Sequence, residues 1–212
     1  HPTYWGTVLE PIVATHYSKR TGNKVRKVNA ILQHPEHPFM LANLDREVIG
    51  QPDVQILECK TAGAYGAKAW KDGVPEYVLV QVMHQLAVTG KQAADVAVLI
   101  AGQDLQIHRV YRDEALIAQL IELEAQFWWH VENNIPPAAD GSDSAAQALQ
   151  ALFQHDNGHI LDLTYDADMN AVFDELVTIR NHLDDYKAKE SLLKQRIQQT
   201  MAEHSHAQSR NG

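Results

Sequence analysis

The chain has a single cysteine, Cys59, among its 212 residues. One cysteine excludes an internal disulfide, a thiolate zinc site and a four-cysteine iron–sulfur cluster. It also predicts a reducing compartment, so we expect a cytoplasmic protein. No apolar run approaches the ~20 residues that span a bilayer, and no signal peptide opens the chain, so no membrane partner is expected. The first residue is His1 rather than Met, which is consistent with a trimmed chain or a fragment.

Positive charge is missing from one long stretch. Residues 113–179 contain thirteen Asp and Glu and no Lys or Arg, whereas residues 1–112 contain twelve basic and ten acidic residues. The net charge of −9 therefore originates in one segment. A basic surface on the first half stays compatible with this total, because steering depends on where charge lies.

The apolar periodicity predicts a mixed α/β domain that ends near Pro137. An apolar fraction of 45% and a mean hydropathy of −0.33 exclude disorder as the main state. We expect helices at 5–20, 75–88 and 113–132, and strands at 25–32, 39–49, 54–61, 94–101 and 105–112. The domain boundaries predicted in this way are 1–137 and 138–212.

Residues 138–212 have a different character. They begin as a linker rich in Ala, Ser, Gly and Asp, with a short helix expected at 144–153. A long amphipathic helix follows, whose apolar residues alternate in steps of four and three: Val172, Leu176, Ile179, Leu183, Tyr186, Leu193 and Ile197, with Glu190 filling one position of the stripe. This heptad pattern predicts lengthwise packing on another helix. That helix belongs either to an intramolecular hairpin or to another subunit or partner.

The residues that suggest chemistry lie on the hairpin formed by 39–49 and 54–61. A turn centred between Gln51 and Pro52 pairs residues whose numbers add to 103, which places Asp45 opposite Glu58. Facing residues of an antiparallel pair have Cβ atoms ~4.5–5.5 Å apart. Two carboxylates at that distance repel each other, and a hard cation such as Mg²⁺ would relieve the repulsion.

Lys60 lies two residues beyond Glu58 and therefore points to the same face. An ammonium there can hold a nucleophilic water or neutralise charge on a phosphate, which suits metal-assisted phosphodiester hydrolysis. The alternative is an ordinary charged surface hairpin, since Glu-x-Lys triplets are common. Two features favour the site: Asp45 lies in an apolar strand start, and Leu57 and Cys59 alternate with the charges.

Four motifs in a consistent order resemble the YqaJ-type viral recombinases, relatives of lambda exonuclease and members of the PD-(D/E)XK nucleases. The resemblance covers residues 6 to about 137. The motifs are Gly6-Thr7-Val8-Leu9-Glu10-Pro11 with Tyr17 and Thr21-Gly22; Ala42-Asn43-Leu44-Asp45; Leu57-Glu58-Cys59-Lys60-Thr61; and Pro75-Glu76-Tyr77 leading to Gln81-Val82-Met83-His84-Gln85 and Thr89-Gly90.

The resemblance implies a role for each matched residue. Asp45 and Glu58 would bind Mg²⁺ together with the backbone carbonyl of Cys59, and Lys60 would position or activate the attacking water. Glu10 would approach a second metal position. Gln81 would brace the site or touch DNA, and Gln85 is open to the same role or to a packing role.

The resemblance also implies a fold and a function. The fold is a PD-(D/E)XK core, a mixed central sheet flanked by helices, with a C-terminal helical extension. The function is a Mg²⁺-dependent exonuclease of phage or prophage recombination, with Mn²⁺ as a substitute cation, acting in the bacterial host cytoplasm. It would resect double-stranded DNA ends 5′→3′ for a single-strand annealing protein, as a homo-oligomer. The alternatives are an endonuclease on the same core and a non-catalytic recombination scaffold.

Histidines and lysines add two weaker expectations. The pairs His34/His37 and His204/His206 lack further ligands at zinc-like spacing, so no functional zinc site is expected. Basic residues of the first half either line the DNA side or form a solvated helix end: Lys19, Arg20, Lys24, Arg26, Lys27, Lys68 and Lys71.

Overall fold

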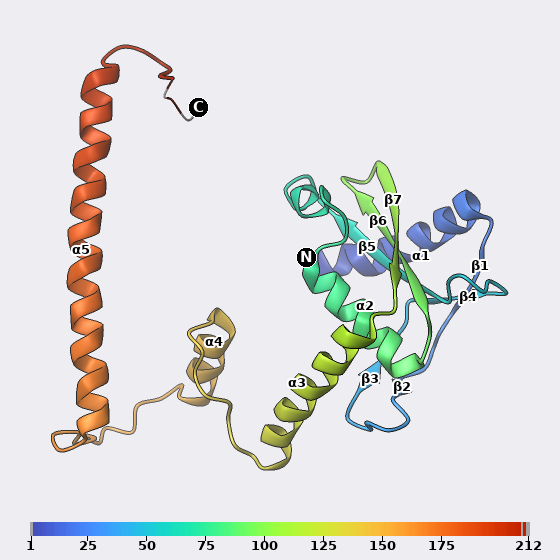
Figure 1. Cartoon of the computed structure of the whole chain (residues 1–212), viewed down its shortest axis with the longest axis horizontal. Coiled ribbons are helices and arrows are strands. Elements are labelled where there is room, and N and C mark those ends of the chain that lie inside the picture. Colours follow the sequence, from blue (N-terminus) through green and yellow to red (C-terminus); the bar gives the residue numbers. More distant parts are fainter. Residues whose placement is uncertain (1, 209, 211–212) are drawn as a thin grey trace. The chain divides into compact units, whose positions relative to one another are not determined.

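A five-stranded sheet forms the centre of the first part of the chain, in the order β1-β4-β5-β6-β7 (Figure 1). The computed structural model describes residues 2–208 and residue 210, and it divides into two compact units, His1–Ala138 and Ala139–Gly212. The strands of the sheet are β1 (Lys24–Lys27), β4 (Arg46–Ile49), β5 (Ile56–Ala62), β6 (Ala93–Ile100) and β7 (Asp104–Tyr111). β5 and β6 are parallel, and the other neighbouring pairs are antiparallel.

Helices cover both faces of this sheet (Figure 1). On one face, Val13 and Tyr17 of α1 (Pro2–Thr21) pack with Leu57 and Ala97. On the other face lie α2 (Glu76–Thr89), which makes the crossover that a parallel pair requires, and α3 (Glu114–Glu132). The predicted mixed α/β core is therefore confirmed as three layers.

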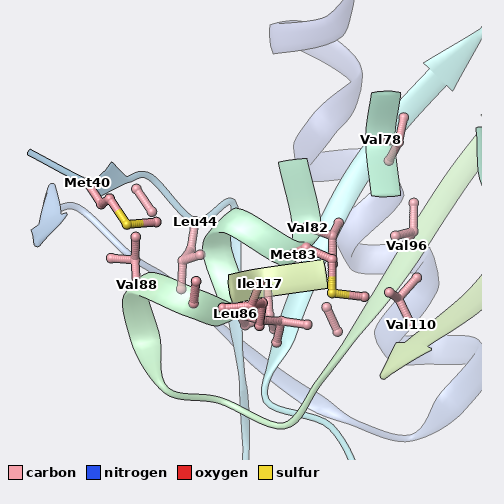
Figure 2. Packing of buried hydrophobic residues seen from close by; sticks show 14 of the residues in the cluster. Met40, Leu44, Val78, Val82, Met83, Leu86, Val88, Val96, Val110 and Ile117 are labelled. Atoms are coloured by element: carbon pink, nitrogen blue, oxygen red, sulfur yellow. The ribbon is translucent and has the colours of Figure 1, made fainter. Parts of the chain in front are cut away.

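The core between the sheet and α2 is the larger of the two (Figure 2). Figure 2 labels ten of its side chains: Met40, Leu44, Val78, Val82, Met83, Leu86, Val88, Val96, Val110 and Ile117. Successive residues of a strand point to opposite faces, so Ile56 joins this cluster while Leu57 joins the α1 cluster. By the same alternation, Glu58 faces α2.

The end of α2 and its contacts with neighbouring segments are both well defined. Its C-terminus is closed by Gly90, whose φ of +66° is the left-handed conformation typical of a helix C-cap. Within the helix, Nδ1 of His84 lies 2.7 Å from Glu124 of α3, and Nε2 lies 2.9 Å from the carbonyl of Leu41. His84 thus holds α2 against α3 and against β3, the strand that precedes Asp45 in the chain.

Two predicted strands are each divided in the structure, which corrects the expectation of continuous strands at 25–32 and 39–49. The first becomes β1 and β2 (Leu32–Gln33), and the second becomes β3 (Leu41–Ala42) and β4. The reason is that β2 and β3 pair with each other in a separate two-stranded sheet. Apolar alternation continues through both pieces because each is half-buried, so periodicity alone does not show the break.

The remaining element of the first unit is a short 3-10 helix, η1 (Gly66–Trp70), in the connection after β5. The buried Trp70 anchors this connection to the core beside α2.

The second unit contains α4 (Asp143–Leu152) and α5 (Ala167–Met201). Each begins at a capping side chain, Ser142 and Asp166, which accepts a hydrogen bond from the first turn. Neither helix has a buried residue. Among the described residues, no helix is both long and apolar enough to cross a membrane.

Candidate active site

The β4–β5 hairpin places the candidate residues on one side of the sheet. Arg46 pairs with Leu57 and Glu47 with Ile56, so the observed register has the sum of 103 that the turn predicts. Asp45 is the residue just before β4, and this register carries it opposite Glu58. The turn itself is possible because Gly50 adopts a φ of +72°.

Glu58 lies at the centre of a hydrogen-bond network with α2. Only 3% of the residue is exposed. Its Oε1 accepts from Nε2 of Gln81 at 2.8 Å and lies 2.8 Å from Nζ of Lys60. Its Oε2 accepts from Nε2 of Gln85 at 2.9 Å. A buried carboxylate with three donors is held in one orientation, because each donor restricts the rotation of the carboxyl group.

Lys60 and Gln81 form the open side of this network. Nζ of Lys60 also donates to Oε1 of Gln81 at 2.8 Å, so the amide of Gln81 contacts both Lys60 and Glu58. Gln81 is exposed and Lys60 is half-buried, whereas Glu58 is buried. The network therefore meets solvent at Gln81 and Lys60, which cover the carboxylate of Glu58.

The ionised form of the Asp45 carboxylate is destabilised by its surroundings. Its Oδ2 accepts the backbone N–H of Cys59 at 2.8 Å. Burial and the neighbouring charge of Glu58 raise the pKa of Asp45 from 3.8 to about 6, and Glu10 adds to this effect. The hydrogen bond from Cys59 and the charge of Lys60 lower the pKa of Asp45, but they offset only part of this increase. The ionised pair of Asp45 and Glu58 thus carries excess negative charge that a cation would stabilise.

Glu10 reaches this region from α1, on the other face of the sheet. Its carboxylate forms an ion pair with Arg46, and Nη1 of Arg46 also donates to the carbonyl of Asp45 at 2.6 Å. Arg46 is only 8% exposed. The chain of contacts from Glu10 through Arg46 to Asp45 fixes the backbone where the strand begins.

The available donors suit a hard divalent cation. Asp45 and Glu58 offer carboxylate oxygens, and Cys59, whose N–H donates to Asp45, follows Glu58 in β5 and offers its carbonyl. The thiol of Cys59 packs with the α1 cluster, and burial and the charge of Asp45 raise its pKa well above the ordinary range. Across the residues that the structure describes, no three acidic, His or Cys side chains converge on one point. Mg²⁺ is commonly bound by one or two carboxylates with waters and phosphate, so two carboxylates are a sufficient protein contribution.

The sequence motifs do not single out Arg46, and they leave the role of Gln85 open. Arg46 lies at a position that the register predicts to be buried, and a buried arginine requires an acidic partner. That reasoning would have led to Glu10. For Gln85, the question was left open, and the structure shows it 3% exposed with Nε2 bonded to both Glu58 and the carbonyl of Asn43, at 3.1 Å. Its Oε1 has no hydrogen-bond partner in the described part of the chain.

The predicted basic residues do not share one environment. Lys19, Lys24, Lys27, Lys68 and Lys71 are exposed. Arg20 donates to the carbonyl of Leu105, and Arg26 pairs with Glu47 at 2.5 Å. The latter two have structural partners, and the five lysines are the candidates for contact with a polyanion.

Comparison with known families identifies the first part of the chain. Residues 1–92 match the family model of the YqaJ-like viral recombinase domain. This segment is similar to YqaJ-like viral recombinase domains. It contains α1, the β4–β5 hairpin and α2, and therefore every predicted site residue, so the resemblance inferred from the motifs is confirmed.

The chain is also similar to a curated relative and to two solved structures. It is 42% identical over 166 residues to the uncharacterized protein YqaJ of Bacillus subtilis (strain 168), which covers 76% of this chain and 51% of that protein. The chain thus spans about half the length of this relative.

The fold is similar to that of an alkaline exonuclease, LHK-Exo, from Laribacter hongkongensis. The TM-score is 0.57 at 24% identity, covering 71% of this chain and 75% of the exonuclease. LHK-Exo in complex with dAMP matches with a TM-score of 0.56 at 25% identity, over 71% and 73% of the two chains. The predicted nuclease-type core with a C-terminal helical extension is therefore confirmed as a fold.

Proposed function

We propose that the YqaJ-like domain is a metal-dependent deoxyribonuclease that acts in DNA recombination. The observation that carries this proposal is the pair of carboxylates formed by the half-buried Asp45 and the buried Glu58, with the ammonium of Lys60 2.8 Å from Glu58. A scaffold protein has no physical reason to keep two carboxylates that destabilise each other. The family match and the exonuclease fold support the same class of enzyme.

In this proposal Asp45 and Glu58 would hold Mg²⁺ together with the Cys59 carbonyl, and Mn²⁺ could replace it. When bound, the cation would polarise the phosphate and lower the pKa of a coordinated water. Lys60 holds the attacking water or neutralises charge on the phosphate. Water adds across one P–O bond: its oxygen bonds to phosphorus, and its proton goes to the leaving oxygen.

The other residues position these groups. Gln81 fixes Lys60 and Glu58 relative to each other through the two ends of its amide. Gln85 orients the second oxygen of Glu58. Glu10 remains a candidate for a second metal position, and a direct contact would require its ion pair with Arg46 to open.

The proposed substrate is the end of linear double-stranded DNA, resected 5′→3′, as part of phage or prophage recombination in a bacterial cytoplasm. A homo-oligomer and a single-strand annealing protein complete the proposal. Fold similarity and the family match support a nuclease on DNA, and these finer features rest on the motif resemblance.

The test is digestion of linear DNA labelled at either end, beside closed circular plasmid, with and without Mg²⁺ or Mn²⁺. We expect metal-dependent release of the 5′ label and resistance of the circle. Glu58→Gln and Lys60→Ala should each lower the rate on the order of 100-fold or more, with melting curves as a check on folding. Glu36→Gln, on an exposed loop, is the matched control.

Each other outcome has a defined meaning. Nicking of the circular plasmid would favour an endonuclease on the same core. Unchanged degradation by both folded variants would exclude the proposed centre, and no degradation by the wild type under any condition would favour a scaffold.

A further inference from the structure

The apolar stripe of α5 is exposed along its whole length. The apolar side chains of the stripe lie open to solvent, with Leu176 41%, Leu183 50%, Leu193 56% and Ile197 58% exposed. Thirty-five residues of helix extend for about 52 Å. α4, the other helix of the same unit, has ten residues and is too short to cover that length. The second unit therefore contains no helix long enough to form an intramolecular hairpin with α5. A long exposed heptad stripe of this kind is typical of a helix that pairs with a separate chain.

Charge divides α5 into two halves of opposite sign. Residues 167–185 contain five acidic residues and one arginine: Asp168, Asp174, Glu175, Asp184, Asp185 and Arg180. Residues 186–201 contain four basic residues and one glutamate: Lys187, Lys189, Lys194, Arg196 and Glu190. A parallel pair of these helices would place like charges together, whereas an antiparallel pair places the acidic half of each against the basic half of the other.

The steps of four and three define one full-length antiparallel register. Stripe residues of the two copies face each other when their numbers add to 369. Leu176 then lies opposite Leu193, and Leu183 lies opposite Tyr186. The whole stripe is covered in this arrangement, because its centre coincides with the two-fold axis.

The charged residues beside the stripe make one attractive and one repulsive contact in this register. Glu175 lies next to Arg196 of the copy, and this contact occurs twice because of the symmetry. Glu190 faces Ile179 of the copy and lies beside Arg180 of the copy. Its charge offsets part of the repulsion between that Arg180 and Lys187. In a parallel pair, the two copies of Glu190 would instead face each other within the apolar seam, which is unfavourable for two like charges.

We propose that α5 binds α5 of a second copy of this chain as an antiparallel coiled coil in this register. This interface is independent of the nuclease site, and it would link two copies through the segment that follows the YqaJ-like domain. It does not depend on the proposed activity, because every argument for it comes from residues 167–201.

Cysteine cross-linking of the full chain tests the orientation. Val172→Cys and Ile197→Cys are prepared separately and oxidised alone and as a mixture, with the wild type as the control for Cys59. We expect a covalent dimer only in the mixture, since Val172 faces Ile197 of the copy. Cross-links within each separate variant would show a parallel pair and overturn the proposal, as would the absence of cross-links in all samples.

Charge reversal tests the register. Glu175→Lys should weaken self-association of the full chain about tenfold, measured by sedimentation equilibrium at low salt. The double variant Glu175→Lys with Arg196→Glu should restore it. Asp174→Lys changes the net charge equally but lies on the side away from the stripe, so it is the matched control. An equal effect of Asp174→Lys, or no rescue by the double variant, would overturn this interface, with circular dichroism confirming that each variant keeps its helix content.

Discussion

Replacing Asp45 by Asn should stabilise the protein while removing the proposed metal ligand. The carboxyl has a pKa of about 6 in the folded protein instead of 3.8. At pH 8, ionising it in the folded state costs about 3 kcal/mol more than in the unfolded state. Asparagine avoids this cost, but its oxygen is a weaker acceptor for the N–H of Cys59, which offsets about 1 kcal/mol. We expect the free energy of unfolding to rise by about 2 kcal/mol.

The increase in the free energy of unfolding of Asp45→Asn should be larger at high pH than at low pH. As the pH falls through 6 towards 3.8, the folded wild type takes up a proton at Asp45 before the unfolded chain does, so the wild type is stabilised. The difference between Asp45→Asn and the wild type should therefore be largest at pH 8 and small near pH 4. Urea denaturation in the presence of a chelator, followed by circular dichroism, measures it.

Two controls accompany this experiment. Asp53→Asn, on the exposed turn of the same hairpin, should change the stability by less than about 0.5 kcal/mol. Excess Mg²⁺ should raise the melting temperature of the wild type and not that of Asp45→Asn, because a ligand that binds only the folded state stabilises it. The explanation would be refuted if Asp45→Asn were less stable than the wild type at pH 8. It would also be refuted if the increase in the free energy of unfolding did not change with pH.

Three further predictions concern the fold around the site. Asp95→Asn should lower the free energy of unfolding by about 3 kcal/mol in urea denaturation, since Asp95 is 2% exposed and pairs with Arg109 at 2.8 Å and Tyr17 at 2.7 Å. Burial and Asp95 raise the pKa of Tyr17 to about 12, so an absorbance titration of the seven tyrosines should show a component above pH 11 that Tyr17→Phe removes. The stabilising hydrogen bond of the Tyr17 hydroxyl is complete below pH 10 and is lost as the pH rises through 12. Gly90→Ala should cost about 1 kcal/mol in the same denaturation assay, because φ is +66° there while the space around a Cβ is open.

The hairpin shows why part of the site was predictable from the sequence. The turn at Gly50–Asp53 is short, so it determines the pairing of the residues on either side, and one count places Asp45 opposite Glu58. Strand alternation then places Lys60 on the face of Glu58, and the 2.8 Å contact between them agrees. These predictions succeed because they involve neighbours along the chain.

The ion pair of Glu10 and Arg46 shows where such reasoning stops. The two residues are separated by 36 positions, and their contact depends on how α1 packs across the sheet. The same holds for Gln85, whose bond to Glu58 follows from the position of α2 above β5. Spacing along the chain carries no information on how deeply a helix packs or which way it is rotated.

The amino-acid sequence by itself determined the helices, the hairpin register and the amphipathic stripe of α5, because each follows from a local period of 2.0 or 3.6 residues and from short turns. Tertiary structure alone decided the division of the strands between two sheets, the partners of Glu58 and the elevated pKa of Asp45. Those properties arise from desolvation and from charges that distant segments bring together, and both depend on the packing of the whole domain.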